Sequence, residues 1–194
     1  MGNKGFSYER SICKQLSLWW TAGERDDIFW RTPGSGARAT TRAKQNKDTF
    51  GQHGDMQAID PIGLPFTNLL FIEIKRGYPN ATASNIIDAP SNAKQSQLET
   101  FVSKAIHSST LANAYSWMII HKRDRREPTI IIPSSLTEEF MFYKKIFELK
   151  MYLSMRYQTK NNTSCRINQI LFSAFLLAVT PAQIKQIYRN WRTC

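Results

Sequence analysis

Two acidic residues and one lysine, Asp55, Glu73 and Lys75, lie in two short segments that both read as strands. Residues 55–60 alternate in polarity, and residues 68–75 are apolar until Glu73 and Lys75, which period-two geometry places on one face. If the segments pair as a hairpin, Asp55 and Glu73 meet at its open end, where two carboxylates would hold a divalent cation such as Mg2+. Lys75 is then placed to orient or help deprotonate an attacking water, or to neutralise charge on a phosphate.

The same three residues also allow a simpler interpretation, because their spacing is a loose pattern. Glu73 and Lys75 can form an ordinary ion pair at a strand end, with Asp55 as a turn residue. Charges at the end of a buried strand are nevertheless costly to desolvate, which favours a site that compensates for them.

A third carboxylate, Glu9, is predicted on the apolar face of an amino-terminal helix over Lys4–Trp20. It falls in one stripe with Ile12, Cys13, Leu16 and Trp20. A surface helix normally keeps its glutamates on the other side. Glu9 therefore suits a metal site, although a first-turn glutamate stabilised by the helix dipole is the alternative.

Between these elements, residues 32–37 form a loop in which backbone amides and the Ser35 hydroxyl can approach a phosphate. Residues 38–53 follow as a basic segment that we expect to contact backbone phosphates. A plain turn and a solvated run of charge are the alternatives. The predicted DNA contacts are Arg31, Ser35, Arg38, Arg42, Lys44, Lys47, Arg76 and Lys94.

The remaining elements are predicted from periodicity and capping signals. A strand is expected within residues 26–31, and a helix over 92–106 is capped by Ser91 and carries Lys94 and Gln95 in its first two turns. Strands over 115–122 and 129–133 follow, then a long helix over 138–156, a polar linker, and helices over 168–179 and 182–191.

The 194 residues are enough for one domain with a substantial core, or one domain with an extension. A net charge of +11 indicates a polyanionic partner, with nucleic acid as the first candidate and an anionic membrane surface as the second. Three widely spaced cysteines argue against a disulfide framework or a zinc site. The polar opening residues predict no signal peptide, and the run 170–179 is too short to span a bilayer.

The order of these features resembles the PD-(D/E)xK nuclease superfamily and, within it, the archaeal-type Holliday junction resolvases. The resemblance covers about residues 3–133 and leaves residues 134–194 outside. It rests on Lys4-Gly5-Phe6-Ser7-Tyr8-Glu9-Arg10, Gly34-Ser35-Gly36, Gly54-Asp55, Glu73-Ile74-Lys75 and a helix carrying Gln95. Gly54 stands where the superfamily usually has proline.

The resemblance implies an α/β fold with a restriction-endonuclease-like core over residues 1–133, in which helices flank a central mixed β-sheet. Residues 134–194 are expected to form a helical extension packed on that core, serving dimerisation or DNA contact. The implied activity is Mg2+-dependent hydrolysis of DNA phosphodiesters, with Mn2+ expected to substitute. By the same resemblance Glu9, Asp55 and Glu73 are metal ligands, Lys75 is catalytic, Ser35 lies at the scissile phosphate and Gln95 matches a helix position.

We therefore expect a structure-selective endonuclease acting on branched DNA as a homodimer, since two symmetric cuts need two sites related by a twofold axis. A restriction-type or phage DNA-processing endonuclease acting on duplex DNA is the alternative enzyme. A non-catalytic DNA-binding protein on the same fold is the alternative of another class, and a membrane-surface protein is the least favoured. The composition fits a prokaryotic, archaeal or viral protein of the cytoplasm.

Overall fold

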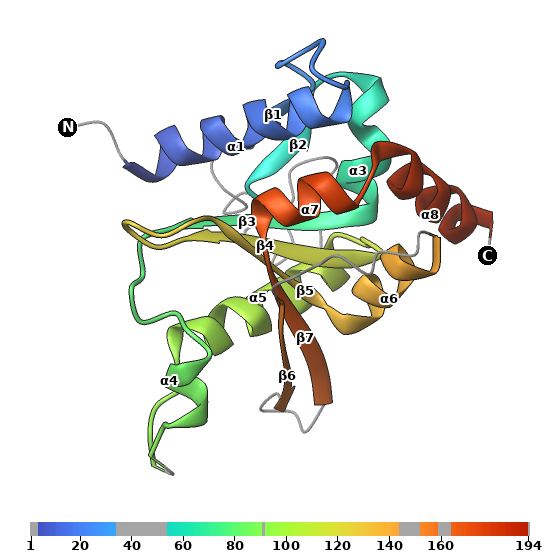
Figure 1. Ribbon diagram of the computed structural model, residues 1–194. Coiled ribbons are helices and arrows are strands. Elements are labelled where there is room, and N and C mark those ends of the chain that lie inside the picture. Colours follow the sequence, from blue (N-terminus) through green and yellow to red (C-terminus); the bar gives the residue numbers. More distant parts are fainter. Residues whose placement is uncertain (1–3, 34–53, 91, 144–151, 159–163, 194) are drawn as a thin grey trace, which may run out of the picture.

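The computed structural model describes residues 4–33, 54–90, 92–143, 152–158 and 164–193 (Figure 1). Its helices are α1 (Lys4–Trp20), α3 (Leu64–Leu69), α4 (Ser84–Ile87), α5 (Gln97–Leu111), α6 (Ser134–Tyr143), α7 (Phe172–Ala178) and α8 (Pro181–Thr193), with a 3-10 turn at Pro61–Gly63. Its strands are β1 (Phe29–Arg31), β2 (Met56–Ala58), β3 (Leu70–Arg76), β4 (Ser116–Lys122), β5 (Thr129–Pro133), β6 (Tyr152–Gln158) and β7 (Ser164–Leu171). Within these ranges no helix has both the length and the apolar character needed to cross a membrane.

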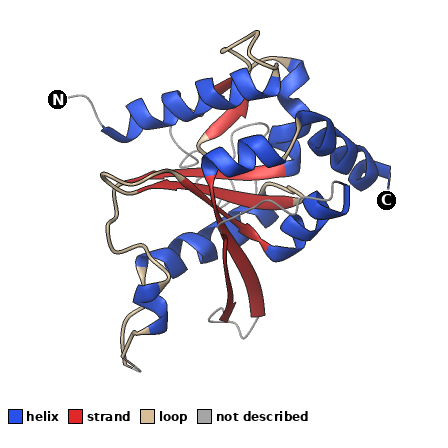
Figure 2. Ribbon diagram, in the orientation of Figure 1, coloured by secondary structure: helices blue, strands red, loops and turns tan. Residues whose placement is uncertain are grey.

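A mixed sheet with strand order β3–β4–β5–β7–β6 forms the centre of the molecule. β3 and β4 run parallel, whereas the other neighbouring strands are antiparallel. β1 and β2 form a separate antiparallel pair. Figure 2 shows helices on both sides of the sheet. The expected α/β class is confirmed, and the architecture is consistent with a restriction-endonuclease-like core.

The two faces of β3 contribute to two different cores. Leu70, Ile72 and Ile74 belong to a large buried cluster that includes residues of α1, α7 and α8. Phe71 belongs to a second cluster with Leu98 and other residues of α5. In Figure 1, α1 and α7 lie above the sheet and α5 lies below it. By alternation, Glu73 and Lys75 continue the row of Phe71 along the strand.

The hairpin expected between residues 55–60 and 68–75 is wrong. β2 pairs with β1, and β3 pairs with β4. The 3-10 turn and α3 occupy residues 61–69, so Asn68 and Leu69 end a helix instead of opening a strand. One backbone hydrogen bond, from Asp55 N–H to the Ile72 carbonyl oxygen at 2.8 Å, still joins the start of the β2 segment to the edge of β3.

The sequence predicted a helical extension after residue 133. The structure has two strands there as well as helices. Residues 152–156 belong to strand β6 instead of the long helix, and residues 168–171 belong to strand β7 instead of the next helix. β7 pairs with β5, which extends the central sheet. The β-branched side chains of Ile167 and Ile170 fit this pleated, buried surface, so tertiary pairing overrides the helical pattern there. The last predicted helix is confirmed as α8.

The helix predicted over residues 92–106 begins later. α5 starts at Gln97, with Ser96 as its N-cap. Ser96 accepts a hydrogen bond from the Glu99 backbone, and the Glu99 side chain accepts one from the Ser96 backbone, which completes a capping box. Lys94 and Gln95 therefore precede the helix. The predicted strands over residues 115–122 and 129–133 are confirmed as β4 and β5.

Candidate active site

Asp55 is held against the edge of β3 by its neighbour Gly54 and by two hydrogen bonds. Besides the backbone bond to Ile72, Asp55 Oδ2 accepts a hydrogen bond from Ile74 N–H at 2.7 Å. Gly54 has a φ of +78°, and a Cβ built on it would lie 2.5 Å from the Ile72 carbonyl oxygen. Glycine alone tolerates this approach, and proline, whose φ is fixed near −65°, cannot adopt it. The departure from proline at Gly54 thus has a structural cause.

Lys75 joins the two carboxylates of the site. Its ammonium lies 3.4 Å from Asp55 Oδ2 and also forms an ion pair with Glu73 Oε2. The Asp55 side chain is buried, while those of Glu73 and Lys75 are about one fifth to one quarter exposed. The structure therefore brings together the three residues that the sequence singled out first, at the end of β3.

The pKa values of Glu73 and Lys75 are both raised. Burial raises the pKa of Glu73, and the neighbouring Asp55 charge raises it further. Burial by itself lowers the pKa of Lys75, but the charges of Asp55 and Glu73 outweigh that effect and leave its pKa above the usual value. Lys75 is thus held as a cation, which favours its binding a phosphate oxygen or orienting water over its acting as a base.

Glu9 lies on the buried side of α1, as its stripe predicted, and is 8% exposed. Its Oε2 accepts a hydrogen bond from Arg31 Nε at 2.7 Å, and the Arg31 guanidinium lies over the Phe6 ring. The Ser17 hydroxyl fixes α1 to β1, because it donates to the Cys13 carbonyl oxygen and accepts from Phe29 N–H. Arg31, predicted to contact DNA, is here the ion-pair partner of Glu9.

Three further polar groups lie near this end of β3; the sequence reasoning named Arg76 only as a DNA contact and missed Tyr8 and Thr32. Within the described residues, the buried Tyr8 hydroxyl, Thr32 Oγ1 and Arg76 Nε have no hydrogen-bond partner. The Arg76 guanidinium lies 5.5 Å from the centre of the Tyr8 ring, and Thr32 N–H donates to the Asp55 carbonyl oxygen. Buried polar atoms without partners are rare in folded proteins, and a functional role is one explanation for them. Their positions follow from tertiary packing, so no spacing in the sequence indicates them.

Other predicted site residues lie elsewhere. Gln95 precedes α5 and donates a hydrogen bond to Ser103 Oγ. Lys94 lines a shallow pocket with Asn80, Asp88 and other residues of the connection before α5. Ser35, Arg38, Arg42, Lys44 and Lys47 lie outside the described residues.

The donor set suits a hard divalent cation. Mg2+ is commonly held by one or two carboxylates, with waters and substrate phosphate completing its coordination. Asp55 and Glu73 supply two carboxylates that both contact one ammonium, so their oxygens already lie around a common point. Among the described residues, no group of three or more histidine, cysteine, aspartate or glutamate side chains is close enough to hold a metal. Glu9, in its pairing with Arg31, does not complete such a group.

Comparison with protein families gives a match. The profile of a family described as "Phage putative PDDEXK endonuclease" matches residues 2–186. The matched segment therefore continues through β6, β7 and α7 and into α8, well beyond residue 133. No match was found among curated proteins or among solved structures.

Proposed function

The chain belongs to the family of phage putative PDDEXK endonucleases, and from this membership we propose that it is a Mg2+-dependent endonuclease that hydrolyses DNA phosphodiester bonds at Asp55, Glu73 and Lys75. The observation that carries the proposal is the convergence of two carboxylates on the Lys75 ammonium beside the edge of β3. A net charge of +11 supports a polyanionic substrate.

Asp55 and Glu73 would hold the cation, which supplies Lewis-acid polarisation of the phosphate and lowers the pKa of bound water. Asp55 is fixed for this role by the Ile74 N–H bond, and Glu73 by its place on β3. The Lys75 ammonium binds a non-bridging phosphate oxygen and orients the attacking water. Its fixed positive charge stabilises the negative charge that develops on the phosphate as the bond to the leaving oxygen breaks.

We propose two alternative DNA substrates for this reaction. Branched DNA, cut by a homodimer, follows from the likeness to Holliday junction resolvases. Duplex DNA, cut during phage DNA processing, is favoured by the description of the family that the chain matches. The two differ in a measurable way, because paired nicks across a junction need two active sites related by a twofold axis.

The test uses labelled four-way junction, Y-fork, linear duplex and single strand, each with Mg2+ and with EDTA. Mg2+-dependent paired nicks confined to the junction, together with a dimeric mass in solution, would support the resolvase substrate. Cutting of linear duplex would support the phage-type substrate. Tight, salt-sensitive binding without any cutting would refute the nuclease proposal in favour of a non-catalytic DNA-binding protein.

Three variants connect the activity to the site. Glu73→Gln removes one carboxylate charge and should abolish cutting, while Glu24→Gln, on the exposed turn after α1, should cut normally. Lys75→Met should slow cutting by about 100- to 1,000-fold, the cost of removing one preorganised electrostatic group. Unchanged cutting by both site variants would contradict the assignment.

Metal binding can be measured without any DNA. At a Mg2+ concentration of about 100 times the dissociation constant, binding to the native state should raise the free energy of unfolding by about 2.7 kcal/mol. Glu73→Gln should lose this increase, whereas Glu24→Gln should keep it. A Mg2+ effect that persists in Glu73→Gln would place the metal elsewhere.

A further inference from the structure

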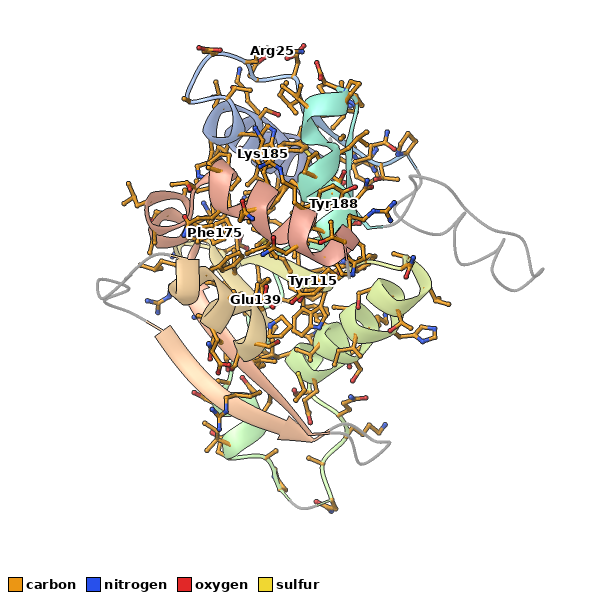
Figure 3. All side chains as sticks on the ribbon, turned by 90° about the vertical axis from the view of Figure 1, so that its right-hand side faces the viewer. Arg25, Tyr115, Glu139, Phe175, Lys185 and Tyr188 are labelled. Carbon is orange, nitrogen blue, oxygen red and sulfur yellow. The ribbon has the colours of Figure 1, made fainter. Side chains whose placement is uncertain are left out.

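A cavity of about 460 Å3 lies between β2, α3, the end of α5 and α8. The residues that line it include Tyr188, Trp191, Gln57, Asn68, Arg192 and Phe71. Figure 3 labels Tyr188 on α8 and Tyr115 at the start of the β4 segment, on the side of the molecule that carries this cavity. The volume falls within the range of sites that enclose a small ligand, about 300–1,000 Å3, and is far too small for duplex DNA.

Two residues that line the cavity are close along the chain to the carboxylates of the candidate active site. Gln57 is two residues after Asp55, and Phe71 is two residues before Glu73. Residues two apart along an extended chain face the same side, about 6.5–7 Å from each other. Both lining residues are therefore within two residues of a carboxylate of the site. A cavity this close to the carboxylates suits a group of the nucleotide next to the phosphate at the site.

The chemistry of the walls suits a planar, polar ring. The ring centres of Tyr188 and Trp191 lie 6.0 Å apart at 61°, and Trp191 also lies 5.8 Å from Tyr115. Aromatic faces stack on any nucleobase, and amide side chains offer both donors and acceptors to its edge. Asn68 Nδ2 donates a long hydrogen bond to the Tyr188 hydroxyl at 3.5 Å. Arg192 adds a positive charge to the lining.

We propose that this cavity binds one unpaired nucleobase of the DNA, the base adjacent to the bond that is cut. The inference rests on the proposed nuclease function. A base must leave the DNA stack to enter the cavity, so the DNA must be distorted on binding. DNA with an unpaired base next to the cleavage point therefore binds more tightly than perfect duplex. Mismatched or already unpaired bases cost the least to extrude.

The direct test is photocrosslinking with unmodified protein in EDTA, where binding is separated from cutting. Each DNA duplex carries one unpaired 5-iodouracil, moved stepwise along the strand, and crosslinked peptides are identified by mass spectrometry. The expected result is a crosslink to Tyr188 or Trp191 from one position, next to the bond cut when Mg2+ is supplied. Crosslinks only to residues outside the cavity, or none at any position while the DNA is bound, would overturn the proposal.

The same duplexes distinguish the two levels of inference. Cutting in Mg2+ without a crosslink to the cavity would refute the base-binding role and leave the nuclease function intact. A crosslink to the cavity with no cutting in Mg2+ would refute the nuclease function and leave base binding intact. Absence of DNA binding would refute both.

Matched variants give an independent readout of binding affinity. Tyr188→Ala should weaken binding of the unpaired-base duplex by about 5- to 150-fold, the usual cost of losing one base–aromatic stack, whereas Tyr188→Phe should bind normally. Arg192→Ala should weaken the unpaired-base duplex more than perfect duplex. Arg189→Ala, on the same helix but outside the cavity, should affect both duplexes equally. Equal effects of all four variants on both duplexes would contradict the proposal.

Discussion

Replacing Gly54 with alanine should damage the site more than the fold. The added Cβ would lie 2.5 Å from the Ile72 carbonyl oxygen, whereas ordinary van der Waals contact begins at 3.4 Å. The chain must therefore shift by about 0.9 Å at the point where Asp55 bonds to β3. A positive φ costs an alanine about 1–2 kcal/mol, and weakening the Asp55–Ile72 hydrogen bond adds about 0.5–1.5 kcal/mol.

Urea unfolding of Gly54→Ala should show a loss of about 1.5–3.5 kcal/mol in the free energy of unfolding. Cutting of DNA should fall by about 100-fold, because a misplacement of about 1 Å at an active site commonly has that effect. The fall in activity should remain at temperatures where the variant is fully folded.

Gly23→Ala is the matched control. Gly23 also has a positive φ, +94°, but no atom of the described residues lies within 4 Å of the position that its Cβ would take. It also follows the end of α1, far along the chain from Asp55. This variant should lose only the backbone term of about 1–2 kcal/mol and should cut normally. Equal losses of stability in the two variants, with normal cutting by Gly54→Ala, would refute the claim that Gly54 positions Asp55 by close approach.

Three further outcomes are expected from the buried groups around the site. Tyr8→Phe should raise the free energy of unfolding by about 1 kcal/mol, because the buried hydroxyl has no partner within the described residues; a decrease in urea unfolding experiments would reveal a partner. Arg31→Leu should lower the free energy of unfolding by about 3 kcal/mol, because it leaves Glu9 buried and unpaired. Adding Glu9→Gln should restore part of this loss. Additive effects in the double-mutant cycle would contradict the pairing. Burial and the nearby Glu9 and Asp55 charges raise the pKa of Cys13 to about 12. The protonated thiol therefore stabilises the fold below its unfolded pKa near 9, and this stability is lost as pH rises toward 12. Between pH 8 and 10 the wild-type protein should lose about 1.4 kcal/mol more than Cys13→Ala, and parallel pH curves would refute the shift.

The three residues named first by the sequence were the ones that the fold brought together. Asp55, Glu73 and Lys75 converge even though the hairpin that was meant to unite them does not exist. The prediction that Glu73 and Lys75 share one face was correct because this alternation is local geometry, fixed once residues 70–76 form a strand. The partner strand was wrong because a loop of turn-forming residues with two prolines can also open a short helix, as α3 does, with Pro65 in its first turn.

The errors in the carboxyl-terminal third have a common origin. An apolar run such as residues 170–179 has no clear period, so it can be read as helix or as buried strand. Pairing with β5 turned its first residues into the end of β7, and the rest became α7. The early start predicted for α5 failed for another reason: Ser96 and Glu99 form a capping box, a local signal that was present in the sequence, but the cap was assigned to Ser91 instead.

By itself, the sequence determined the helix α1, the strands β4 and β5 and the alternating charges at the end of β3, because each depends on local periodicity. It also determined the basic character that suits a polyanion, because net charge depends on composition alone. Only the tertiary structure decided that Asp55 is fixed to β3 by Gly54 and that Glu9 pairs with Arg31. It also decided that polar atoms of Tyr8, Thr32 and Arg76 are buried near the site, and that a cavity forms between β2, α3 and α8. Each of these features depends on contacts between segments that are far apart along the chain. Such contacts are set by the packing of the whole core and not by spacing along the chain.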